Sequence, residues 1–175
     1  MKHNGQHLRI IAVDPCLKGF GFAVLEGGTR LVDWGVARVW GASEKELVAR
    51  VEDLLLRYRS KCLVLANLDN VRRVSRRTRR VRVLEEYGKR SRLQLLRVSR
   101  ASVQAAFQDT GVTKREIALA ISHLFPELEP HLPPVRKPWM SEDERMNIFD
   151  AVALVVTALA SPPAARNGRT HNLSA

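Results

Sequence analysis

The chain has little cysteine and no apolar run long enough to cross a membrane. Of its 175 residues two are cysteines, Cys16 and Cys62, and no cluster of cysteine and histidine has the spacing of a zinc site. Two cysteines in or beside apolar runs predict a reducing compartment rather than a disulfide framework. The first six residues are polar and lack the core of a signal peptide. We therefore expect a cytoplasmic protein without membrane contact.

Acidic residues are also scarce, with 18 Asp and Glu against 29 Lys and Arg, so the formal net charge is +11. One segment carries almost the whole excess. From Asn70 to Arg100 there are twelve basic residues and only two acids, Glu85 and Glu86, while the rest of the chain has 17 basic and 16 acidic residues. A polyanion is the natural partner of such a segment, and nucleic acid is the commonest polyanion inside a cell.

Arginines dominate the first part of this basic segment. Ser75 is a suitable helix cap, and Val74, Val81, Leu84 and Tyr87 form a narrow apolar stripe behind it. A run of like charges repels itself unless phosphates or acids compensate it. We therefore predict nucleic-acid contact by seven arginines, namely Arg72, Arg73, Arg76, Arg77, Arg79, Arg80 and Arg82.

Near the N-terminus two short apolar runs are separated by an abrupt stop at Asp14 and Pro15. Residues 8–13 and 20–25 have the length and composition of strands, and Gly19 and Gly21 lie where the second run begins, as expected for an antiparallel hairpin. A carboxylate at the tip of a buried strand has lost part of its hydration and needs a cation, a donor or a proton. An aspartate that only turns the chain into a loop would explain the hairpin equally well.

The remaining pattern predicts one α/β domain over residues 8–160, with an N-terminal extension (1–7) and a disordered tail (161–175). We expect strands at 30–39, 61–66 and 93–98, and helices starting at Ser43, Ser75, either Ser99 or Ser102, Thr113 and Ser141. A strand, a helix and a strand in succession form a right-handed crossover, so the strand at 61–66 should run parallel to the first. Asn67 or Asp69 would then emerge at the same sheet end as Asp14.

The last predicted helix begins with acidic residues and is wholly apolar after Asp150. Seven residues are almost two helical turns, so Asp143 and Asp150 should share a face, with Asn147 close to it. An acid entering the apolar half of a helix needs a specific partner, which makes Asp150 a candidate site residue. Asp143 has an ordinary alternative, since acids favour the N-terminus of a helix.

The order of these pieces resembles the ribonuclease H-like superfamily, and within it the RuvC Holliday junction resolvases. The resemblance covers about residues 8–160. The matching segments are residues 11–15 (IAVDP) with Gly19 and Gly21, residues 102–106 (SVQAA) through Gly111 and Lys114, and residues 147–154 (NIFDAVAL). It implies a mixed five-stranded sheet, with an antiparallel hairpin followed by parallel strands, flanked by helices.

In that family four carboxylates hold two Mg²⁺ ions, with Mn²⁺ as an alternative, and the ions drive hydrolysis of a phosphodiester. Asp14 matches the first family ligand and Asp150 the last. Asn67 stands where the family carries Glu, and Asn147 stands where it carries Asp or His. Asp69 and Asp143 are the nearest substitutes. The implied catalytic and metal-binding set is therefore Asp14, Asp69, Asp143 and Asp150, and Lys114 joins the residues expected to contact nucleic acid.

The resemblance implies a homodimeric, Mg²⁺-dependent endonuclease that resolves Holliday junctions or other branched DNA. The two asparagines leave an alternative from another class of protein. A non-catalytic nucleic-acid-binding module, or a subunit of a larger assembly, could keep the fold after losing the metal ligands. A third alternative is a nuclease or binding subunit that acts on RNA.

Overall fold

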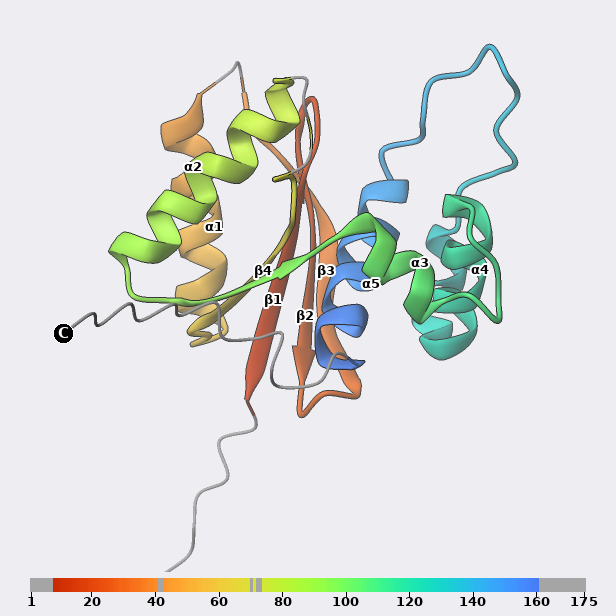
Figure 1. Cartoon of the computed structure of the whole chain (residues 1–175), viewed down its shortest axis with the longest axis horizontal. Helices are drawn as coiled ribbons and strands as arrows, with labels where there is room; N and C mark the ends of the chain where they lie inside the picture. The colour runs from red at the N-terminus through yellow and green to blue at the C-terminus, as the bar shows by residue number, and fades with distance from the viewer. Residues whose placement is uncertain (1–7, 41–42, 70, 72–73, 161–175) are drawn as a thin grey trace, which may run out of the picture.

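A five-stranded sheet separates two layers of helices in the computed structural model, which describes residues 8–40, 43–69, 71 and 74–160 (Figure 1). The strand order is β3-β2-β1-β4-β5. The strands are β1 (Arg9–Pro15), β2 (Gly19–Glu26), β3 (Arg30–Arg38), β4 (Cys62–Ala66) and β5 (Gln94–Val98). The helices are α1 (Glu44–Arg57), α2 (Arg76–Arg90), α3 (Arg100–Ala106), α4 (Lys114–Leu124) and α5 (Met146–Ala160), with a 3₁₀ helix η1 (Pro126–His131).

The predicted mixed sheet is confirmed, because β1, β2 and β3 pair antiparallel while β4 and β5 continue the sheet parallel to β1. β1 runs further than expected, since Asp14 pairs with Gly21 and Pro15 with Phe20. Pairing with β4 stops at Ala12. The last residues of β1 therefore have a strand neighbour on one side only, and a proline without an N–H is tolerated there.

Alternate residues of β1 belong to two separate cores. Ile11 and Val13 pack under α1 and α2, whereas Ile10 and Ala12 face α5. Figure 1 shows α1 and α2 on one side of the sheet and α5 on the other, with α3 and α4 outside α5. Since side chains alternate along a strand, Asp14 continues the face of Ile10 and Ala12 and points toward α5.

The helix caps follow the sequence closely. Ser43, Ser75, Ser99 and Thr113 each accept a hydrogen bond from a backbone N–H in the first turn of the helix that follows. In α4 the Glu116 side chain also bonds back to the N-cap backbone and completes a capping box.

The predicted start of the last helix at Ser141 is wrong, because α5 begins at Met146. The Asp143 carboxylate accepts bonds from the backbone N–H of Arg145 at 2.9 Å and from the Arg145 guanidinium at 2.7 Å. The Met146 N–H bonds to the Asp143 carbonyl at 3.0 Å, so Asp143 caps a short turn that leads into the helix. The part of the chain that the structure describes contains no helix long and apolar enough to span a membrane. The predicted extension and tail lie outside the described residues.

Candidate active site

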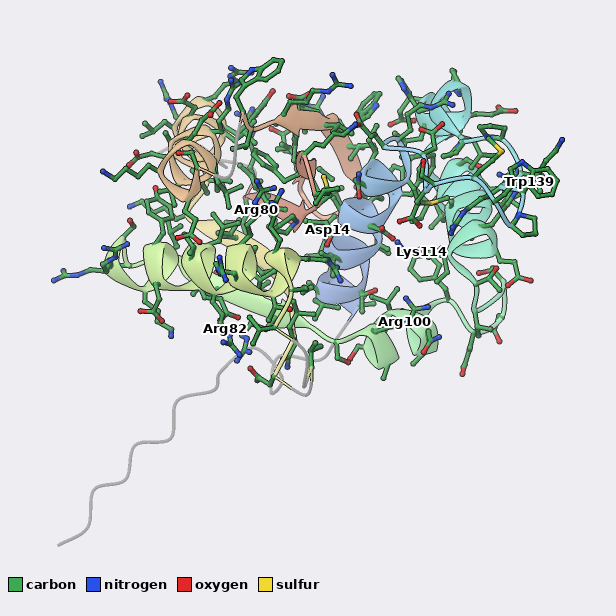
Figure 2. All side chains as sticks on the ribbon, turned by 90° about the horizontal axis from the view of Figure 1, so that it is seen from above. Asp14, Arg80, Arg82, Arg100, Lys114 and Trp139 are labelled. Atoms are coloured by element: carbon green, nitrogen blue, oxygen red, sulfur yellow. The ribbon has the colours of Figure 1, made fainter. Side chains whose placement is uncertain are left out.

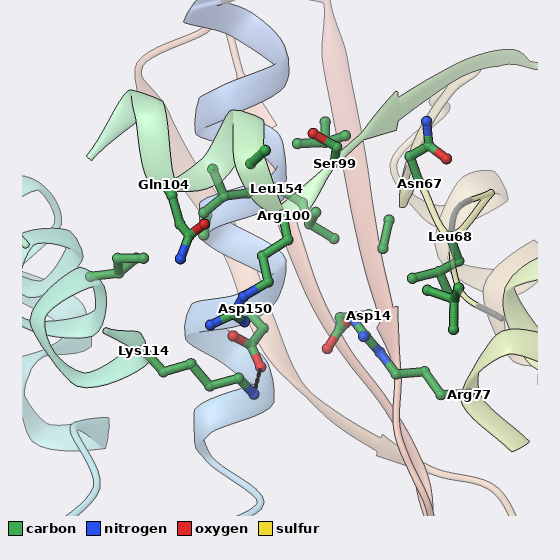
Figure 3. Close-up of a pocket in the computed structure, with 17 residues that line it drawn as sticks. Asp14, Asn67, Leu68, Arg77, Ser99, Arg100, Gln104, Lys114, Asp150 and Leu154 are labelled. Atoms are coloured by element: carbon green, nitrogen blue, oxygen red, sulfur yellow. Dashed lines mark hydrogen bonds and ion pairs between the residues drawn. The ribbon is translucent and has the colours of Figure 1, made fainter. Parts of the chain in front are cut away.

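Asp14 of β1 and Asp150 of α5 line one cavity of about 430 Å³ (Figure 3). The cavity lies where the parallel strands end. Ala66 at the end of β4, the two residues that follow it and Val98 of β5 form part of its wall, and α3 begins beside it. Open α/β sheets bind their ligands at the carboxyl ends of parallel strands, so the position agrees with the general rule for such folds.

Gly21 brings the two acids together. It pairs with Asp14 across the hairpin, and a Cβ on it would lie 2.0 Å from the backbone oxygen of Asn147. Only a glycine allows α5 to approach β2 this closely. Since Asp150 lies about one helical turn after Asn147, this approach places its carboxylate near Asp14.

Asp14 is 3% exposed, and an Arg77 Nη2 donates to its Oδ1 at 2.6 Å. Arg77 comes from the first turn of α2 and lines the same cavity. The strand-end aspartate is therefore a buried carboxylate with a cation partner, as expected from the cost of burying an unpaired charge. It does not merely lead the chain into a loop.

Burial is the largest effect on Asp150, and together with the negative charge of Asp14 it raises the pKa of Asp150 to about 6. Lys114 opposes this shift, because its Nζ donates to Asp150 Oδ2 at 2.8 Å. The two carboxylates are close enough to repel each other, and the dashed line in Figure 3 marks the Lys114 contact.

Two further charged residues reach the site without having been predicted. Lys114 Nζ also donates to both carboxylate oxygens of Glu142, at 3.0 and 3.1 Å, so Glu142 shares a cation with Asp150. Arg100 lines the cavity, and Figure 3 shows its side chain directed into it from α3. Arg100 follows a predicted parallel strand, and this position could have indicated a site residue. No pattern in the sequence around Glu142 indicated its contact with Lys114.

The structure does not bring Asp69 and Asp143 to this cavity. The Asp69 side chain is 60% exposed and is ion-paired with Arg97. Asp143 pairs with Arg145, which lowers the pKa of Asp143. Because α5 starts late, Asp143 does not share its face with Asp150. Their roles as ligands remain predictions.

Both asparagine side chains are hydrogen-bonded to groups other than the two acids. Asn67 lines the cavity, yet its Oδ1 accepts from the Asp69 N–H at 3.0 Å and from Arg97 at 3.2 Å, and Figure 3 shows the amide turned away from Asp14. The Asn147 amide donates to the Glu144 carbonyl at 2.9 Å. Within the described residues, no group of three or more His, Cys, Asp or Glu is placed to hold a metal ion.

The arginines of α2 serve different purposes. Arg76, Arg79 and Arg82 are exposed and remain available for a phosphate backbone. Arg80 is 1% exposed and donates to the carbonyls of Cys16 and Gly19, so it supports the turn after Asp14 rather than facing a ligand. Arg72 and Arg73 lie outside the described residues.

Comparison with known proteins gives a structural likeness without a sequence match. No protein-family model and no curated protein matches the chain. RuvC of Thermus thermophilus in complex with a Holliday junction substrate superposes with a TM-score of 0.59 at 19% identity, covering 86% of this chain and 92% of that one. A second structure of Thermus thermophilus RuvC superposes with a TM-score of 0.57 at 17% identity, and it covers the same percentages of the two chains. At this identity the likeness establishes the fold, and the chain therefore has the ribonuclease H-like fold of RuvC.

Proposed function

We propose that this protein is a divalent-metal-dependent endonuclease that acts on branched DNA. The observation that carries the proposal is the facing pair of Asp14 and Asp150, which come from the first strand and from the last helix into one cavity. The two acids come from opposite ends of the chain, and their proximity disfavours the ionised form of Asp150. Such an arrangement is typical of a functional site.

The donor set fits one divalent cation between these two carboxylates. Mg²⁺ is commonly held by one or two carboxylates and completes its coordination with water and substrate phosphate. A cation at this point would also relieve the repulsion between Asp14 and Asp150. A four-carboxylate set for two ions is not assembled, because Asp69 and Asp143 are paired elsewhere. When bound, such an ion would polarise the phosphate and lower the pKa of a water molecule.

The cations around the pair are suited to holding the phosphate that is cut. Arg77 and Lys114 reach the cavity from opposite sides (Figure 3), and Arg100 lines it as well. A phosphate entering the cavity would compete with the carboxylates for Arg77 and Lys114. Guanidinium groups bind phosphate through two parallel hydrogen bonds, which would fix the orientation of the scissile group.

The proposed substrate follows from charge and from the structural neighbour. The local excess of +10 predicts a polyanion, and the Thermus thermophilus RuvC to which the fold is similar is described with a Holliday junction. We propose a four-way or otherwise branched DNA as substrate, and a homodimer that cuts two strands symmetrically.

One observation favours a second candidate, a nucleic-acid-binding module without catalysis. Both acids of the pair are already neutralised by cations of the chain, Asp14 by Arg77 and Asp150 by Lys114. If these ion pairs persist in the complex, the cavity has no net negative charge to attract a divalent ion.

Cleavage assays on a set of labelled substrates separate the two candidates. The intact chain is incubated with a four-way junction, a linear duplex of the same sequence and an RNA–DNA hybrid, each with Mg²⁺, Mn²⁺ or EDTA. We expect paired cuts on opposite strands of the junction that require the metal. Tight junction binding without cuts under any condition would overturn the nuclease and leave the binding module.

A further inference from the structure

The segment between η1 and α5 exposes three large apolar side chains. Trp139 is 78% exposed, Val135 69% and Met140 43%, and all three lie within six consecutive residues. Single exposed apolar residues are ordinary, but a group of them that includes a tryptophan indicates an interaction surface. We call residues 132–142 the tryptophan loop.

The loop is held in place by the chain although it contains neither helix nor strand. Arg115 of α4 donates to the Pro133 carbonyl, and Arg136 Nε donates to the Met140 carbonyl at 2.6 Å. The Met140 N–H bonds back to the Lys137 carbonyl at 3.0 Å. Three prolines restrict the backbone further. An aromatic side chain on such a support loses little conformational entropy when it binds.

The charge beside Trp139 is positive. The Lys137 ammonium lies 5.5 Å from the centroid of the Trp139 ring, and Arg136 is nearby in the chain. Residues 130–141 contain no acid. The acid that follows them, Glu142, is directed to Lys114, which it shares with Asp150. A partner therefore has to offer negative charge together with flat apolar groups.

The tryptophan loop borders the candidate active site. A second cavity of about 440 Å³ lies against the loop, and Lys114 lines both this cavity and the one that holds Asp14 and Asp150. Figure 2 shows Lys114 between Asp14 and Trp139 when the molecule is seen from above. A strand whose phosphate reaches Lys114 would thus continue over the loop.

We propose that the tryptophan loop binds an unpaired nucleotide next to the phosphate in the active site, with its base stacked on Trp139 and its phosphate on Arg136 and Lys137. Nucleic acid offers negative charge and flat rings together, and stacking on an aromatic side chain tolerates any base. Paired bases inside a duplex do not expose their faces, so the loop favours the unstacked bases of a branch point. The inference rests on the proposed nucleic-acid partner but does not require cleavage.

Binding in EDTA tests this stacking independently of catalysis. The affinity of the intact chain is measured for a fully paired duplex and for a forked DNA with short unpaired thymidine arms and the same number of phosphates. Trp139→Ala should weaken binding of the fork by about tenfold and leave the duplex unchanged, because one stacked base is lost. Trp139→Phe should recover part of the loss.

Trp40→Ala is the matched control, since Trp40 is similarly exposed, at 74%, outside the loop. It should bind both DNAs as the parent does. Equal weakening of fork and duplex by Trp139→Ala, or no weakening of either, would overturn the stacking site and leave the loop as a contact for a protein. Because the readout is binding without metal, a chain that binds but never cuts would refute the nuclease and not this inference.

Discussion

Asp150 lies in surroundings that favour its protonated form, because burial and the charge of Asp14 raise its pKa from 3.8 to about 6. Between these two values the folded protein holds a proton that the unfolded chain has released. The free energy of unfolding therefore falls as the pH rises through this window, and the cost remains in full above it. A carboxylate that destabilises the fold at neutral pH needs a functional reason to be there.

Replacing the acid by a neutral group of the same shape should remove this cost. Asp150→Asn is expected to raise the free energy of unfolding at pH 7.5, without divalent ions, by on the order of 2 kcal/mol. Below pH 4 both proteins are neutral at this position and the difference should disappear. Urea unfolding at pH 7.5 and pH 3.5 measures it. A variant less stable than the parent at pH 7.5 would mean that the Lys114 ion pair outweighs burial and repulsion.

At the scale of the element, α2 has exposed arginines that can bind a ligand and one buried arginine that stabilises the fold. Arg80 extends into the core and donates to the carbonyls of the turn after Asp14, while Arg76 and Arg79 remain in solvent. The sequence alone did not distinguish the five arginines in the first half of α2 from one another, and all five were expected to contact nucleic acid. Which of them is buried depends on a turn more than 60 residues earlier in the chain.

The buried arginine is expected to be essential for stability and its neighbour dispensable. Arg80→Met should lower the free energy of unfolding by about 3 kcal/mol, because the carbonyls of the turn lose their charged donor. Arg79→Met, the exposed control, should stay within about 0.5 kcal/mol of the parent. Both values come from denaturant unfolding monitored by circular dichroism. Equal losses in the two variants would contradict the structural role of Arg80.

Elements with local signals were predictable, whereas contacts between distant segments were not. Ser43, Ser75 and Thr113 cap the helices expected of them, and Ser99 is the candidate that caps α3. The predicted hairpin forms, although β1 continues through Asp14 to Pro15. The start of α5 was missed because the side chain of Arg145 holds Asp143 in a turn. Glu142 was missed because only the packing of α4 beside α5 brings Lys114 to it.

At the scale of the whole molecule, the net charge of +11 is concentrated in one segment, which makes the affinity for nucleic acid dependent on salt. Each phosphate contact releases condensed counterions, so the logarithm of the affinity should fall linearly with the logarithm of the salt concentration. The exposed arginines of α2 are the described residues expected to contribute most.

Removing three of these charges should flatten the salt dependence. Arg76, Arg79 and Arg82 changed together to Ala should lower the slope by about one unit for each lost phosphate contact, equally for unrelated sequences. The control replaces Lys45, Arg50 and Arg57 of α1, which removes the same charge from another helix. Fluorescence anisotropy over a range of salt concentrations gives both slopes. If the two triple variants have the same slope, the effect comes from overall charge and not from contacts by α2.

The central claim is that Asp14, and not the exposed Asp69, forms the metal-holding pair with Asp150. Single-turnover cleavage of a four-way junction at saturating protein, as a function of Mg²⁺ concentration, tests it most directly. Asp14→Asn should reduce the cleavage rate by roughly 10³-fold or more while junction binding is retained. Asp69→Asn should cleave like the parent. Unchanged cleavage by Asp14→Asn, or a loss confined to Asp69→Asn, would contradict the account.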